Sequence, residues 1–111
     1  SINALNAVAY DLKRAMKTDG TAVLAAACPE GAGTNYLESV GMRLYLKFTR
    51  EMMGLGKYGA ILYSPNLSYP EVKLFYPDDT LVLNRWEQVA EELEKRHGKQ
   101  ATATIFPCAS L

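Results

Sequence analysis

One loop of the sequence gathers residue types that can bind a ligand, the stretch ACPEGAGTN at residues 27–35. Gly31 and Gly33 can bring the backbone close to a ligand or take a positive φ. Thr34 or Asn35 can cap a following helix, whose free N–H groups then face an anion. The spacing matches neither the GxGxxG fingerprint nor the phosphate-binding loop that ends in Gly-Lys-Ser/Thr. The residues alone therefore favour a turn with a helix cap over an anion site, and both interpretations stay open.

The other candidate groups offer less. Glu30 would repel a phosphate unless it points away or bonds a hydroxyl. Cys28 could act as a nucleophile, but no histidine lies near it in the sequence, so a reduced, buried cysteine is the simpler interpretation. Cys28 and Cys108 lie far apart without metal-ligand spacing, and the lone His97 lies at a charged helix end. We therefore expect no catalytic residue and no metal site in this chain alone.

Length and charge limit the partners. The 111 residues are 49% hydrophobic and carry 12 basic and 12 acidic side chains, which predicts one domain over residues 1–111 and no nucleic-acid ligand. Residues 21–28 form a nearly uncharged stretch that is too short to cross a bilayer, and we expect no signal peptide at the start of the chain. We therefore expect no membrane partner and a cytoplasmic location. Because Ser1 rather than Met precedes the first helical pattern, we also expect a piece of a larger protein.

Helical periodicity occurs three times along the chain. Apolar residues at three- and four-residue steps predict helices over residues 2–16, from 36 or 37 to 53, and from 84 to 97. The last helix is predicted to begin at Asn84, with Glu87 completing a capping box, and to end at Gly98. Residues 71–75, flanked by prolines, fit at most one helical turn.

Strand patterns alternate with these helices. Four short apolar runs predict strands over residues 21–27, 58–63, 80–83 and 102–106. Parallel neighbours need a crossover, so this alternation indicates an α/β fold, a three-layer α/β/α sandwich whose mostly parallel sheet has about four strands. In such sheets ligands bind beyond the carboxyl ends of the strands. The loop after the first strand, together with Ser64 and Asn66 after the second, is therefore the candidate binding surface.

Four stretches, taken in order, resemble the C-terminal domain of the nickel-pincer-nucleotide-dependent lactate racemase family. They are NALNAVAYDLKRAMKTDGTAVLAAACPEGAGTN, YGAILYSPNL, NRWEQVAEEL and ATATIFPCAS. In that family a Cys-x-Glu-Gly-x-Gly loop follows the first strand, and a proline ends the last strand. The matching residues are Cys28, Glu30, Gly31, Gly33 and Pro107. Asp19 and Gly20 stand where Gly-Gly is commoner in the family.

The resemblance implies a two-domain enzyme that racemises or epimerises a small 2-hydroxy acid by passing a hydride to and from a nickel-pincer nucleotide. It places the metal-binding histidine, the cofactor-linked lysine and the paired histidine bases on an N-terminal catalytic domain. This chain would then be inert alone, would bind no cofactor by itself, and would help to close the cleft. The residues that would line the cleft are Glu30, Gly31, Gly33, Thr34, Asn35, Ser64 and Asn66. The alternative is a stand-alone α/β binding or scaffold module with a small anionic ligand at the same loop.

Overall fold

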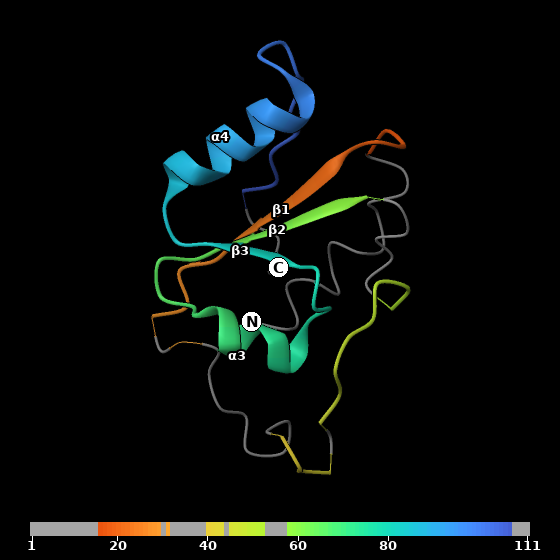
Figure 1. The fold of residues 1–111 in the computed structure, drawn as a ribbon, viewed down its shortest axis with the longest axis vertical. Coiled ribbons are helices and arrows are strands. Elements are labelled where there is room, and N and C mark those ends of the chain that lie inside the picture. The colour runs from red at the N-terminus through yellow and green to blue at the C-terminus, as the bar shows by residue number, and fades with distance from the viewer. Residues whose placement is uncertain (1–15, 30, 32–39, 44, 53–57, 108–111) are drawn as a thin grey trace.

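The computed structural model describes residues 16–29, 31, 40–43, 45–52 and 58–107. Among these residues it shows a small α/β fold with a three-stranded parallel sheet and two helices (Figure 1). In chain order the elements are β1 (Thr21–Ala25), β2 (Gly59–Tyr63), α3 (Tyr69–Phe75), β3 (Leu81–Leu83) and α4 (Trp86–His97). The strands lie in the order β1-β2-β3, and both neighbouring pairs are parallel. The first three predicted strands are therefore confirmed.

The register divides the strand residues between two faces of the sheet. The Cα partners at the centre are Val23, Ile61 and Leu81 in one row, and Leu24, Leu62 and Val82 in the next row. Side chains of successive strand residues point to opposite faces. The row of Ile61 and the row of Leu62 therefore contact different parts of the chain.

α3 covers the face that carries Leu62. The buried cluster on this side consists of Leu62, Leu67, Val72 and Tyr76, with Leu24, Phe48, Phe75 and Val82 partly buried against it. α3 begins at a capping box, in which the Ser68 N–H donates to Glu71 Oε2 at 2.9 Å. The single helical turn predicted at 71–75 is therefore a longer helix that starts at Tyr69.

α4 covers the opposite face. Ile61 is 2% exposed and Val89, in the first turn of α4, is fully buried, and Figure 1 shows the two helices on either side of the strands. The predicted end at Gly98 is confirmed, because its φ is 75° and its N–H donates to the Glu94 carbonyl at 2.8 Å. The predicted beginning is one residue early. Arg85 is the N-cap, and its N–H donates to Gln88 Oε1 at 3.3 Å.

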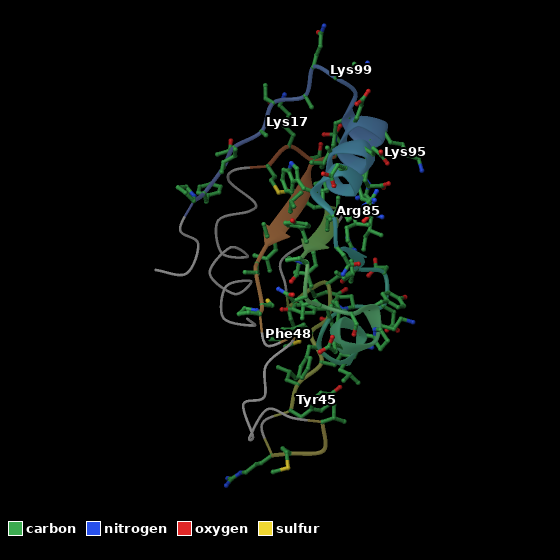
Figure 2. The ribbon with its side chains drawn as sticks, turned by 90° about the vertical axis from the view of Figure 1, so that its left-hand side faces the viewer. Lys17, Tyr45, Phe48, Arg85, Lys95 and Lys99 are labelled. Carbon is green, nitrogen blue, oxygen red and sulfur yellow. The ribbon has the colours of Figure 1, made fainter. Side chains whose placement is uncertain are left out.

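The predicted helix from residue 36 or 37 to 53 is wrong for its described part. Residues 40–43 and 45–52 form turns and irregular chain, because their polar groups bond to α3 and the loop after it. The Phe48 N–H donates to the Phe75 carbonyl at 2.8 Å, and Tyr45 Oη donates to the Leu74 carbonyl at 2.7 Å. These bonds satisfy carbonyls at the carboxyl end of α3, where Figure 2 shows Tyr45 and Phe48.

Ion pairs fasten the same segment to the loop after α3. Lys47 Nζ lies 2.8 Å from Asp78 Oδ1, and Arg50 Nη1 lies 2.7 Å from Asp79 Oδ2. Leu46 and Met52, two apolar residues on which the helical pattern depends, are exposed. Long-range polar bonds, which a periodicity argument does not include, determine the path of this segment.

Two further predictions remain without support from the fold. The helix over residues 2–16 lies outside the described residues except for Met16. The fourth strand, over 102–106, is not confirmed, since the described residues there are exposed and form no strand. Ile105 is 82% exposed and Phe106 is 61% exposed. A strand needs a neighbour for its backbone groups, and no described strand pairs with this segment.

Candidate functional site

The carboxyl ends of the three parallel strands bring three loops together. Residues 26–31 follow β1, Ser64 and Asn66 follow β2, and Asn84 follows β3. The backbone continues the parallel pairing past the strands, because the Ala26 N–H donates to the Tyr63 carbonyl at 3.0 Å. The Ser64 N–H likewise donates to the Leu83 carbonyl at 3.0 Å. We call these three loops the carboxyl end of the sheet.

Ser64 and Asn66 both bind one backbone atom of the first loop. Ser64 Oγ donates to the Ala27 carbonyl at 3.2 Å, and Asn66 Nδ2 donates to the same oxygen at 2.7 Å. The Asn66 N–H in turn donates to Ser64 Oγ at 3.3 Å. Ser64 is fully buried, whereas Asn66 is exposed. The two residues that were expected to line a cleft therefore tie the first loop to the second.

Asn84 holds the second loop from the other side. Its Nδ2 donates to the Leu67 carbonyl at 2.8 Å and to the Ser64 carbonyl at 3.3 Å. Sequence reasoning had assigned this side chain to a helix cap and missed this contact. The signal was ambiguous, because asparagine bonds neighbouring backbone groups in both loops and caps.

A tight turn shapes the first loop. The Gly31 N–H donates to the Cys28 carbonyl at 2.9 Å. The positive φ considered for Gly31 is confirmed at 68°, and Cys28 also has a positive φ, 41°. A non-glycine residue in this region is strained and requires surrounding contacts that hold it. Four other cleft candidates of this loop lie outside the described residues: Glu30, Gly33, Thr34 and Asn35.

A carboxylate lies directly beside this turn. A Cβ placed on Gly31 would lie 2.7 Å from Glu71 Oε1. The other carboxylate oxygen of Glu71 accepts from Ser68 N and from Ser68 Oγ, at 2.9 and 2.5 Å. The first turn of α3 therefore places a negative charge against the loop, which disfavours an anionic ligand there. Sequence reasoning placed Glu71 in a helical turn but not beside Gly31, because 40 residues separate the two.

Cys28 lies close to a buried tyrosine. Burial, together with the nearby Cys28 thiol, raises the pKa of Tyr76 to about 12. Cys28 itself is a free, half-buried cysteine packed against the cluster of Leu62 and Val72. Its contact with the apolar cluster is typical of a structural cysteine, although it is half-buried rather than buried as expected.

Aromatic side chains border the carboxyl end on the α4 face. The rings of Tyr63 and Trp86 meet edge to face with centroids 5.4 Å apart. Trp86, the first residue of α4, is 52% exposed. This exposed ring was not among the predicted site residues, although its place just after the third strand is the feature that could have indicated it.

The described residues do not fit a nickel site. They contain no group of three His, Cys, Asp or Glu side chains that could hold a metal ion. Cys28 follows the carboxyl end of β1, whereas His97 bonds Thr21 at the beginning of the same strand. A thiolate and an imidazole at opposite ends of a strand cannot share one ion.

In the part of the chain that the structure describes, no helix has the length and apolar composition needed to span a membrane. Comparisons with protein-family models, with curated proteins and with solved structures give no match for this chain.

Proposed function

We propose that this chain is the C-terminal domain of a lactate racemase-like enzyme that racemises or epimerises a small 2-hydroxy acid. The carboxyl end of its sheet faces the N-terminal catalytic domain and closes the cleft. The metal-bearing nucleotide belongs to that other domain and supplies the hydride chemistry when bound. The residues of this chain shape the wall of the cleft and exclude water from it.

One observation carries this proposal: the Ala27 carbonyl accepts from both Ser64 and Asn66. These bonds make one connected surface from the two loops that the family resemblance assigns to the cleft. A wall that closes over a reaction must hold its shape without a ligand, and hydrogen bonds between loops provide that rigidity. The observation supports the proposed role of this chain as a wall of the cleft. It does not bear on the chemistry of the N-terminal domain.

The proposal includes the finer architecture. Opposite coverage by α3 and α4 supports a three-layer α/β/α sandwich, and a fourth parallel strand would complete the sheet of about four strands. In such a sandwich the strand-end loops remain uncovered by the helices. They are then free to face a second domain.

The alternative, a stand-alone module for a small anion, has one feature in its favour and one against it. The left-handed Gly31 permits close approach of a ligand to the backbone. The Glu71 carboxylate beside it opposes a negative ligand. Isothermal titration with phosphate, acetate and lactate tests this alternative, which requires binding by the 111-residue chain without any partner.

The main test measures interconversion of D- and L-lactate by the complete polypeptide that contains this chain and carries its nickel-pincer nucleotide. We expect Asn66→Ala to lower turnover several-fold with little change in the thermal midpoint, because its side chain is exposed. Gln100→Ala is the matched control, since Gln100 is exposed beyond α4, and it should leave turnover unchanged. Failure of the unmodified polypeptide to isomerise 2-hydroxy acids contradicts the proposal.

A second test concerns the isolated chain. The 111 residues should bind no nickel at equimolar concentration and should not racemise lactate, because no described cluster offers ligands. Calorimetry measures the first expectation and chiral chromatography the second. A tight stoichiometric nickel site in the isolated chain would contradict the assignment of the metal to the other domain.

A further inference from the structure

We propose that the outer edge of β1 is a docking edge, and that its occupant is the segment 102–106 of the same chain, added as a parallel strand. The proposal rests on backbone directions, on the position of α4 and on the side chains of the segment. It holds whether or not the proposed enzymatic role is correct.

The backbone of β1 has a row of groups that point away from β2. The Gly59 N–H donates to the Gly20 carbonyl, and the Ala26 N–H donates to the Tyr63 carbonyl. Even-numbered residues of β1 therefore face β2, and by alternation Thr21, Val23 and Ala25 direct their N–H and C=O groups outward. No described residue bonds to these outward groups. They form an edge of the kind that accepts another strand.

The connection through α4 leads toward this edge. α3 connects β2 to β3 across one face of the sheet, whereas α4 lies on the opposite face. Crossovers between parallel strands are right-handed in about 98% of cases. The connection from β2 through α3 moves along the sheet toward β3. Because α4 lies on the other face, a right-handed connection through α4 must move in the opposite direction, from β3 back past β2. The first free position in that direction is the outer edge of β1.

The end of α4 already lies at the beginning of β1. His97 Nε2 is 2.8 Å from Thr21 Oγ1, and Gly98, with φ 75°, turns the chain out of the helix. From Gly98 to Thr102 the chain can span roughly 13 Å, whereas neighbouring strands lie about 5 Å apart. Figure 2 shows the chain after Lys99 running to the β1 side of the sheet. The segment is therefore delivered to the correct edge.

The side chains of the segment fit the two faces of the sheet beside β1. With Ile105 beside Leu24, the side chain of Ile105 joins the face of the buried cluster, and Phe106 covers the exposed Ala25 on the other face. Docking would bury two apolar side chains that are now 82% and 61% exposed. The next residue, Pro107, has no N–H to donate, which is how a strand in this place would end.

This register makes an alternating prediction for the amides. In a parallel pair, residue i bonds to the neighbours of its partner. Val23 would accept from the Ile105 N–H and donate to the Ala103 carbonyl, while the Thr104 N–H would face solvent. Amide hydrogen exchange, followed by NMR on the 111-residue chain, should show Val23, Ala103 and Ile105 at least about tenfold slower than Thr104.

A pair of proline variants tests the same alternation. Ala103→Pro removes an N–H that would point toward β1, so it should weaken docking of the whole segment and make the Val23 amide exchange fast. Thr104→Pro removes an N–H that would point to solvent, so the Val23 amide should stay protected. Equal exchange of Thr104 and Ile105 in the unmodified chain would overturn the proposal without reference to either variant. Protection that rises with protein concentration would also overturn it, because the strand would then come from a second copy.

Discussion

The two ends of the sheet are fastened in different ways. At the carboxyl end, the side chains of Ser64, Asn66 and Asn84 bind backbone carbonyls of neighbouring loops, including that of Ala27. At the amino end, in the part of the chain that the structure describes, a side-chain hydrogen bond joins Thr21 of β1 to His97 at the end of α4. The bonds at the carboxyl end of the sheet join one loop to another. The bond at the amino end joins the last residue of α4 to the first residue of β1.

This difference indicates that the carboxyl end of the sheet, and not its amino end, provides an ordered surface. Loops whose carbonyls are held by side chains keep their shape without hydrophobic cover, so they can remain at the surface and still be ordered. A helix end bonded to a strand stabilises packing and defines no surface for a ligand. The following predictions test this contrast, from the largest expected effect to the smallest.

The largest effect concerns alkaline pH and Tyr76, in the buried cluster between α3 and the sheet. The unfolded chain ionises Tyr76 near pH 10, whereas the folded chain holds the proton until about pH 12. Stability from this group is therefore complete below pH 10 and is lost as the pH rises toward 12, by about 2–3 kcal/mol. Urea unfolding at several pH values measures the loss. Tyr76→Phe should remove this part of the pH dependence, and an unchanged pH profile in the variant would show that Tyr76 has no such role.

The next effect concerns Ser64. Ser64→Ala should lower the free energy of unfolding by about 1–3 kcal/mol, because the buried Ser64 hydroxyl makes two hydrogen bonds, to the Ala27 carbonyl and from the Asn66 N–H, each worth about 0.5–1.5 kcal/mol. The matched control is Ser68→Ala, whose hydroxyl is exposed and bonds Glu71 within its own capping box; it should cost less. Chemical denaturation measures the free energy of unfolding of both variants. A larger loss in Ser68→Ala than in Ser64→Ala would mean that the bond from Ser64 to Ala27 does not hold the two loops together.

A glycine pair isolates the contact beside the first loop. Gly31 and Gly41 both have positive φ, 68° and 82°, but only at Gly31 would a Cβ meet another group, Glu71 Oε1. Each change to alanine should cost about 1 kcal/mol for the left-handed backbone. Gly31→Ala should cost more, by the displacement of the carboxylate. Thermal denaturation of the two variants compares them, and equal losses would show that Glu71 moves aside freely.

The smallest effect belongs to the amino end. Thr21→Val keeps the branched shape and removes the hydroxyl that bonds His97, so the expected loss is about 0.5–1.5 kcal/mol. Loop geometry at the other end should not change, and turnover of the complete polypeptide should stay at its original value. A loss of turnover without a change in the thermal midpoint would remove the distinction between the two ends.

The strands and their direction could be predicted from the sequence because local patterns determine them. The runs TAVLA and GAILY are short, apolar and bounded by turn residues, and the intervening lengths of chain permit parallel pairing. The segment around Lys47 and Arg50 could not be predicted, because its partners Asp78 and Asp79 lie about 30 residues away. Periodicity describes one helix face and contains no information on such partners.

The candidate site, too, could be predicted only as far as local patterns determine it. Parallel strand order places Ser64 and Asn66 at the carboxyl end, as expected. Their common acceptor, the Ala27 carbonyl, is 37 and 39 residues away, so no local rule could identify it. The positive φ of Cys28 was also beyond prediction, because only glycine and asparagine signal that conformation in a sequence.

The most direct measurement of the central claim is amide hydrogen exchange on the 111-residue chain, free and within the complete polypeptide. If the carboxyl end closes the cleft, the amides of residues 26–31 and 64–68 should exchange more slowly in the complete polypeptide. Those of residues 97–100, at the amino end, should exchange at the same rate in both. Slower exchange at the amino end with no change at the carboxyl end would contradict the account.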